Sequence, residues 1–118
     1  WYAQDQDFGR KNSVFVNFFG HPAATITATS RIAKAGKAKV MPLTYFRKPD
    51  HSGYVITVHD PIDIPSGNDE ADAQLANDFI EQQLRANPSQ YLWLHKRFKT
   101  PVDPATKKGS LYKKNNKA

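Results

Sequence analysis

SVFVNFFGHPAATITATSRIAKAG, residues 13–36, is the stretch on which the expected fold depends. Its first seven residues alternate, are rich in β-branched and aromatic side chains and stop at Gly20, a pattern that predicts a strand. Pro22 suits the first turn of a helix, and Gly36 suits the position just after a helix end. We therefore expect a helix from Pro22 to about Ala35, whose small residues and threonines would pack closely on a sheet.

Two further strands and a second helix are predicted downstream. KAKVMPLTYF (37–46) is apolar in its middle, as a largely buried strand would be, and YVITVHD (54–60) alternates regularly. A helix is predicted from 69 to about 86: Asp69 and Glu70 suit its positive end, and apolar residues then mark one helical face at Leu75, Phe79, Ile80 and Leu84. Residues 88–98 are expected to form a short helix or turn. This order predicts an α/β fold, with helices packed on a partial mixed sheet.

The amino-acid composition limits the kinds of site and partner that the protein can have. The 118 residues make one small domain at most, and the absence of cysteine excludes disulfides and thiolate ligands or nucleophiles. The net charge of +6 favours an anionic partner: nucleic acid, anionic lipid or an acidic carrier protein. Residues 102–118 hold five lysines, one aspartate and few apolar residues, which predicts a basic, disordered tail.

Several kinds of site are disfavoured by spacing. The histidines at positions 21, 51, 59 and 95 have no i, i+4 partner and no acids at ligand spacing, so we expect no metal. No GxSxG, P-loop or GxGxxG occurs, so we expect neither a serine nucleophile nor a cofactor. No apolar run approaches the roughly 20 residues that span a bilayer. The opening WYAQDQDFGRK lacks the basic start of a signal peptide and reads as a sequence entered in its middle.

Two segments could contribute to a polar site. In QDQDFG, Asp5 and Asp7 are either turn formers or supply an acid that orients a catalytic base or binds a polar group of a substrate. In GHPAATITATS, a helix start after Gly20 could hold a phosphate or carboxylate on free N–H groups, with Thr25 and Thr27 adding hydroxyls. An ordinary capped core helix is the alternative.

YLWLHKRFK, residues 91–99, is both apolar and basic. Its aromatic residues are too dense for base stacking along a groove, which disfavours nucleic acid. We interpret the segment as a last helix that buries its apolar residues and turns its cations toward anionic lipid or an acidic carrier protein. A core-anchoring helix with a solvated end is the alternative. The residues expected at that contact are Trp93, Lys96, Arg97 and Lys99.

The motifs together resemble a known family. DQDFG, VFVNFFG, PAATITATSRIAK, GYVITVHDP and FIEQQLRANPSQYLWLHKRFKT follow one another as in the C-terminal half of the lipid A biosynthesis lauroyl/myristoyl acyltransferases, of the lysophospholipid acyltransferase superfamily. The resemblance covers about residues 1–100. Its most specific part is PSQYLWLHKRFK, close to the family's PEQYLWLHRRFK. This chain has Ser89 where Glu is usual, Lys96 where Arg is usual, and Asn17 where Pro is usual before FFG.

The resemblance implies the C-terminal part of a glycerol-phosphate-acyltransferase-like fold in residues 1–100, followed by a tail in 101–118. It implies a full-length enzyme that moves a fatty acyl chain from acyl carrier protein to a hydroxyl of a lipid A precursor. That reaction would occur at the cytoplasmic face of the inner membrane of a Gram-negative bacterium. The family's catalytic histidine lies in an HxxxxD/E motif, which is absent here. The residues five after the four histidines are Ile26, Ile56, Ile64 and Thr100.

The same resemblance places one acid of the site in this chain. The family's essential aspartate maps to Asp5 or Asp7, and Asp5 is favoured. The catalytic histidine is not in the chain, so we expect the 118 residues alone to be inactive. A non-catalytic module that binds anionic lipid or acyl carrier protein is the alternative, and a nucleic-acid-binding domain is the weakest. The residues expected to form part of the substrate pocket are Gly20, Thr25, Thr27 and Arg97.

Overall fold

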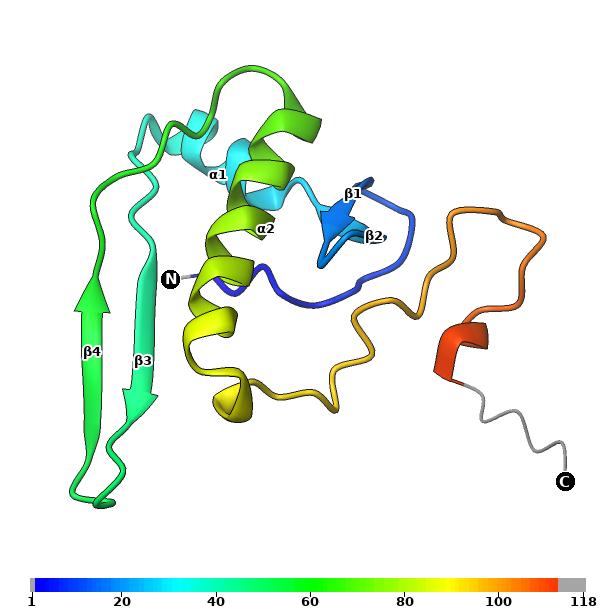
Figure 1. Ribbon diagram of the computed structural model, residues 1–118. Coiled ribbons are helices and arrows are strands. Elements are labelled where there is room, and N and C mark those ends of the chain that lie inside the picture. The colour runs from blue at the N-terminus through cyan, green and yellow to red at the C-terminus, as the bar shows by residue number, and fades with distance from the viewer. Residues whose placement is uncertain (1, 113–118) are drawn as a thin grey trace, which may run out of the picture.

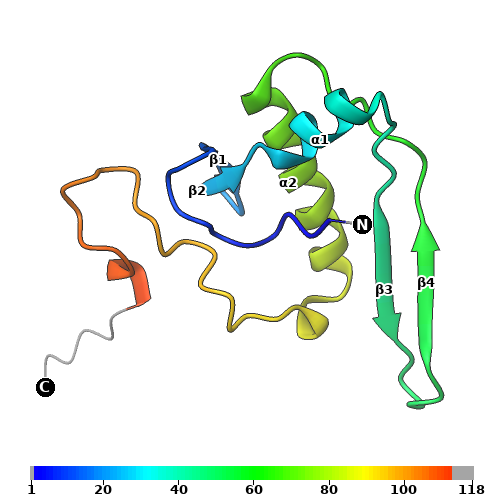
Figure 2. The same ribbon diagram turned by 180° about the vertical axis from the view of Figure 1, so that it is seen from behind.

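The computed structural model describes residues 2–112 and has two antiparallel two-stranded sheets, one on either side of helix α2 (Figure 1). The expected α/β class is confirmed; within the described residues its strands form two hairpins. The view from behind shows the same arrangement (Figure 2). The elements are β1 (Ser13–Phe18), β2 (His21–Ile26), α1 (Ala28–Gly36), β3 (Leu43–Arg47), β4 (Tyr54–Val58), α2 (Asp69–Ala86) and single-turn 3-10 helices at Pro88–Gln90 and Ser110–Tyr112.

The first hairpin occupies residues that were expected to begin a helix. β1 and β2 pair along their whole length, which leaves only Phe19 and Gly20 as the turn. Both have positive φ, 51° and 76°, as a type I′ turn requires, and the twist of that turn matches the paired strands. The helix predicted from Pro22 therefore begins only at Ala28. The prediction was wrong for residues 22–27 because pairing with β1 overrides the helix-start signal of the proline.

The core lies where this hairpin meets α2. Phe18 of β1, Ala23 and Ala24 of β2, and Ala73 and Ala76 of α2 are all buried. The small side chains on both sides allow the helix backbone to approach the sheet closely, while the Phe18 ring fills the remaining volume. The sequence predicted that these small residues would pack closely from a helix. They do pack closely, but Ala23 and Ala24 belong to strand β2.

Helix α2 matches its predicted bounds because its start signals are local. The side chain of Asn68 accepts hydrogen bonds from the backbone N–H groups of Glu70 and Ala71, at 3.0 Å each. This cap satisfies two of the N–H groups that the first turn of a helix leaves free. The prediction of a helix over 69–86 is confirmed.

Asp72, in the first turn of α2, is expected to make the protein less stable in acid. Burial by itself would raise the pKa of this carboxyl, but hydrogen bonds from Ser66 and Ser30 outweigh it and hold the pKa below its ordinary value. Because the folded pKa is the lower one, its stabilisation is complete at neutral pH and is lost as the pH falls below about 4. Urea unfolding between about pH 6 and about pH 2.5 should show a steeper loss for the wild type than for Asp72→Asn. Parallel curves would contradict this.

The second hairpin is shorter and more exposed than the sequence predicted. β3 begins at Leu43 rather than at residue 37, apart from one isolated bridge between Val40 and Ile62. Leu43 and Tyr45 are 45% and 64% exposed. The prediction that this strand is largely buried is wrong, because no part of residues 2–112 covers these two side chains.

The short helix or turn expected over residues 88–98 is confirmed by the 3-10 helix at Pro88–Gln90 and the turns that follow it. The interpretation of residues 91–99 as a last helix is wrong, because they form successive turns. The chain then returns on itself: the N–H of Gly109 donates to the carbonyl of Lys99 at 2.7 Å, and the N–H of Phe98 donates to the Tyr112 hydroxyl at 2.8 Å. The division into 1–100 and a tail stays a prediction. Of the tail, residues 113–118 lie outside the described residues.

Candidate functional site

Asp5 and Asp7, the two candidate acids, have different surroundings. Asp7 is buried, and its carboxylate accepts hydrogen bonds from the N–H of Gly9 and from both the N–H and the hydroxyl of Thr100, each at 2.8 Å. Asp5 is half-buried and accepts no hydrogen bond from the part of the chain that the structure describes. Its Oδ2 lies 3.7 Å from Nδ1 of His95. Asp7 therefore fastens the first loop to Thr100, while the carboxylate of Asp5 is available to a further group.

Arg97 lies in the core, with only 2% of its surface exposed. Its Nη1 donates to the carbonyl of Ala24 at 2.7 Å, and its Nη2 donates to Thr25 Oγ1 at 2.7 Å and to Asn77 Oδ1 at 3.2 Å. The guanidinium carbon lies 5.2 Å from the centre of the Phe18 ring. Burial lowers the pKa of Arg97. The prediction that this arginine faces lipid or substrate is wrong, because its head group is enclosed and four of its five N–H groups are on nitrogens already bonded inside the fold.

The other three residues expected in the substrate pocket also have local structural roles. Thr25 is fully buried in β2, and its hydroxyl donates to a backbone carbonyl and accepts from two side chains. Thr27 is buried just before α1, and its hydroxyl donates to the carbonyl of Asn12 at 3.3 Å. Gly20 is exposed at the hairpin turn. The structure brings Thr25 and Arg97 together, but as a core contact. Since α1 begins at Ala28, the predicted anion site at a helix start after Gly20 is wrong.

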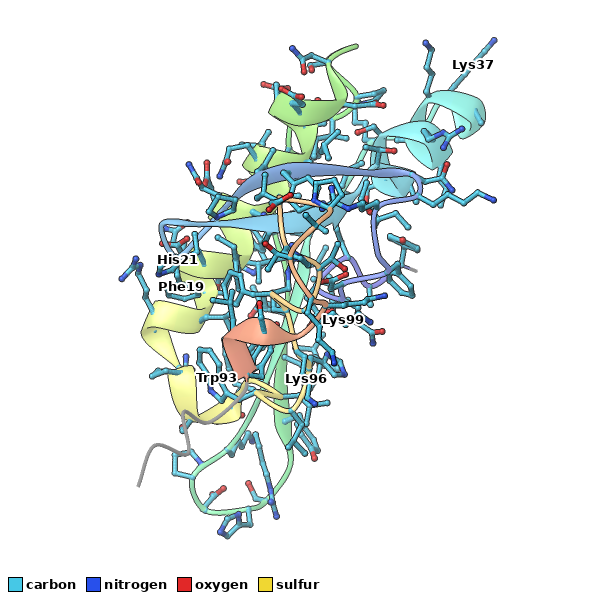
Figure 3. The ribbon with its side chains drawn as sticks, turned by 90° about the vertical axis from the view of Figure 1, so that its right-hand side faces the viewer. Phe19, His21, Lys37, Trp93, Lys96 and Lys99 are labelled. Atoms are coloured by element: carbon cyan, nitrogen blue, oxygen red, sulfur yellow. The ribbon has the colours of Figure 1, made fainter. Side chains whose placement is uncertain are left out.

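Leu92, Trp93, Leu94 and Lys96 form what we call the apolar–basic surface. The three apolar residues are 52%, 57% and 85% exposed, and Lys96 is exposed beside them. Figure 3 shows Trp93, Lys96 and Lys99 on one side of the molecule. This is the reverse of the expected arrangement. Arg97 is buried, whereas the apolar residues are exposed beside Lys96. Exposed apolar side chains next to lysines are typical of a surface that binds a membrane interface.

A second group of polar atoms, which the sequence did not reveal, lies in the same segment as Arg97. The hydroxyl of Tyr91, Nδ1 of His95 and Nε of Arg97 are buried without a hydrogen-bond partner among residues 2–112. Burial, followed by the negative charge of Asp5, raises the pKa of Tyr91 to about 12, so its hydroxyl keeps its proton at neutral pH. Asp5, Tyr91 and His95, which we call the Asp5 cluster, thus offer both a carboxylate and a hydroxyl donor. In the sequence, Tyr91 and His95 look only like parts of an amphipathic segment.

Residues 2–112 contain neither a cluster of metal ligands nor a membrane-spanning helix. No three histidine or acidic side chains converge there as metal ligands would. Neither α1 nor α2 combines the length and the hydropathy that a bilayer crossing requires.

Comparison with known proteins agrees with the resemblance found in the motifs. The family model described as bacterial lipid A biosynthesis acyltransferase matches residues 1–100. A lipid A biosynthesis acyltransferase of Haemophilus influenzae is 41% identical over 115 residues, which is 95% of this chain and 36% of the relative. The lipid A biosynthesis lauroyltransferase and palmitoleoyltransferase of Escherichia coli are 41% and 38% identical over 102 residues, 85% of this chain and 33% of each relative.

The chain therefore spans about a third of the length of the curated relatives it matches. The family match covers the whole of the region in which the motifs were found, from the segment of Asp5 to the apolar–basic surface. The chain belongs to the bacterial lipid A biosynthesis acyltransferase family.

Proposed function

We propose that this chain is part of an enzyme that transfers a fatty acyl chain from acyl carrier protein to a hydroxyl of a lipid A precursor. The reaction would take place at the cytoplasmic face of the inner membrane of a Gram-negative bacterium. The family match over residues 1–100 supports acyl transfer in lipid A biosynthesis. The observation that supports a role for this chain in the site is the carboxylate of Asp5, which accepts no hydrogen bond within residues 2–112 and lies 3.7 Å from the buried, unpaired Nδ1 of His95.

Asp5 would act as a supporting acid rather than as the base. Transfer requires a base to take the proton of the acceptor hydroxyl as its oxygen attacks the acyl thioester. The chain contains no HxxxxD/E motif, so the base would come from the rest of the protein. A free carboxylate can orient that base or hold a hydroxyl of the acceptor, and the Tyr91 hydroxyl can donate a hydrogen bond to an oxygen nearby. Asp7 is unsuited to this role because its oxygens are already bonded.

A graft tests this assignment. The matching third of the Haemophilus influenzae relative would be replaced by this chain, and acyl transfer from acyl carrier protein to a lipid A precursor would be measured. We expect turnover by the graft and none by the isolated 118 residues. Asp5→Asn in the graft should lower kcat about tenfold or more. Asp78→Asn, on the exposed side of α2, is the control that should leave kcat unchanged. Turnover by the isolated chain, or an unchanged kcat for Asp5→Asn, would contradict the proposal.

The apolar–basic surface and Lys99 would contact anionic lipid. Each lysine held near an anionic membrane contributes about 1 kcal/mol, or about fivefold in binding. Lys96→Gln combined with Lys99→Gln should therefore lower partitioning to phosphatidylglycerol vesicles by about 25-fold. The control, Lys34→Gln with Lys37→Gln, removes the same charge from the C-terminal end of α1 and the residue after it, and Figure 3 shows Lys37 at the far end of the molecule. Equal losses for the two pairs would mean that only net charge matters.

One observation favours a second candidate function, a non-catalytic module that binds anionic lipid or acyl carrier protein. The chain carries the exposed apolar–basic surface but not the HxxxxD/E motif. Such a module would bind vesicles or acyl carrier protein saturably, while the graft would show no turnover. Active graft protein would exclude this alternative as the whole function.

A further inference from the structure

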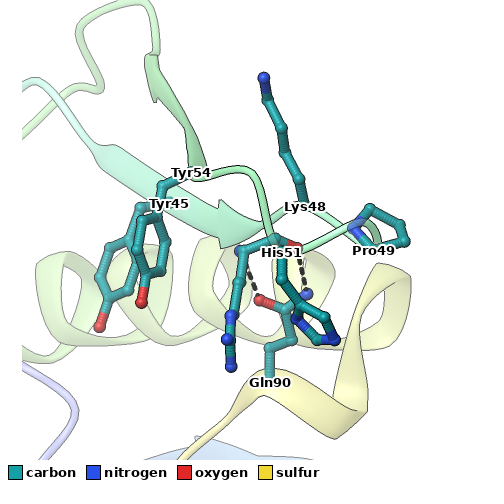
Figure 4. Close-up of a pocket in the computed structure, with 7 residues that line it drawn as sticks. Tyr45, Lys48, Pro49, His51, Tyr54 and Gln90 are labelled. Atoms are coloured by element: carbon teal, nitrogen blue, oxygen red, sulfur yellow. Dashed lines mark hydrogen bonds between the residues drawn. The ribbon is translucent and has the colours of Figure 1, made fainter.

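The β3–β4 hairpin exposes an apolar face that a folded protein would normally cover. Because paired residues of an antiparallel ladder share a face, five large apolar residues lie together on one side of the hairpin. Their side chains are between 45% and 66% exposed, and Val55 on the opposite side is 49% exposed. Figure 4 shows the rings of Tyr45 and Tyr54 side by side. The five residues are Leu43, Tyr45, Tyr54, Ile56 and Val58.

The two edges of the hairpin differ. At the β3 edge, the side chain of Gln90 bonds the backbone of Arg47 as a neighbouring strand would: it accepts from the N–H at 2.7 Å and donates to the carbonyl at 3.0 Å (Figure 4). This end of the β3 edge is therefore occupied from within the chain. The β4 edge has no neighbouring strand within residues 2–112.

The β4 edge consists of the backbone groups of Tyr54, Ile56 and Val58. In an antiparallel ladder, residues that bond the partner strand alternate with residues whose N–H and C=O point away from it. Lys48 bonds Gly53, with its N–H 2.9 Å from the carbonyl of Gly53. Tyr54 is the next residue, so the backbone groups of Tyr54 and of every second residue after it point outward. An exposed, apolar strand edge of this kind is a site for pairing with a further strand.

We propose that the β3–β4 hairpin is part of a wider sheet, and that the part of the acyltransferase fold outside this chain pairs with the β4 edge and covers the apolar face. The opposite side of the hairpin is also partly apolar, because Phe46 pairs with Val55 there. A two-stranded sheet alone is marginally stable in water, and further strands or a helix normally cover it. About two thirds of the relatives' length lies outside the match, which is ample chain to supply them. The inference rests on family membership and on the exposure of the hairpin side chains. It does not depend on whether the protein transfers acyl chains.

Hydrogen exchange measures the pairing directly. The amides of Tyr54, Ile56 and Val58 would be followed in the isolated chain and in the graft, and at the matching positions of the Haemophilus influenzae relative itself. We expect exchange to be at least about tenfold slower in the graft and in the relative than in the isolated chain. Equal rates in all three proteins would overturn the proposal. So would protection that rises with the concentration of the isolated chain and is absent from the relative, since a second copy would then be the occupant.

Two matched substitutions test the covered face. Ile56→Lys changes a residue that is 66% exposed on the hairpin, and Ile32→Lys changes one that is 57% exposed on α1. In the isolated chain both should leave the urea midpoint nearly unchanged. In the graft, Ile56→Lys should lower the yield of folded protein several-fold more than Ile32→Lys. Equal effects in the graft would contradict the proposal. An inactive graft with slowly exchanging β4 amides would contradict the proposed function while supporting this inference.

Discussion

Replacing Arg97 with alanine is expected to lower the free energy of unfolding by about 3–4 kcal/mol. The guanidinium supplies donors to Ala24, Thr25 and Asn77, which are all buried. Without it, the carbonyl and the amide oxygen lose a donor, at about 1 kcal/mol or more each, and a cavity opens against the Phe18 ring. Urea unfolding followed by circular dichroism would measure the loss.

Lys96→Ala is the matched control for Arg97→Ala. It removes one positive charge from the preceding residue, whose side chain is exposed. Surface changes of this kind alter stability by about 0.5 kcal/mol or less. If the two variants unfolded at the same urea concentration, Arg97 would not hold the core together. The same experiment separates the two readings of YLWLHKRFK, because a membrane-facing arginine could be removed without loss of stability.

Replacing Asp7 with alanine is expected to lower the free energy of unfolding by about 3 kcal/mol. Its carboxylate accepts three hydrogen bonds, one from the N–H of Gly9 and two from Thr100, which lies 93 residues away in the chain. Hydrogen bonds to a charged acceptor contribute about 1.5–3 kcal/mol each, and the buried donors of Thr100 would be left unsatisfied. The segment before Ser13 should also become more sensitive to protease, which limited proteolysis would detect.

Asp5→Ala serves as the comparison for Asp7→Ala. Asp5 makes no hydrogen bond within residues 2–112, so its removal should cost about 0.5 kcal/mol or less. A loss of stability at Asp5 as large as that at Asp7 would mean that both acids are structural. The pair thereby separates an acid that holds the fold together from the acid proposed for the site.

Local signals in the sequence predicted the parts of the fold that depend on neighbouring residues. The bounds of α2 follow from the Asn68 cap and from apolar spacing along one segment. β1 and β4 follow from alternation over five or six residues. The quoted motifs were sufficient to identify the family. In each case the deciding residues lie close together in the chain, so their pattern can be read without knowing what they pack against.

Only the tertiary structure decided which strand pairs with which, which cation is buried and which acid is free. Residues 21–26 are a strand because β1 lies beside them, although Pro22 suits a helix start. Arg97 is buried because Thr25, 72 residues earlier, and Asn77 meet it there. Asp7 is occupied and Asp5 is not because Thr100 lies beside Asp7. The physical reason is that burial and hydrogen-bond partners are set by residues distant in sequence, whereas helix caps and strand alternation are set by neighbours.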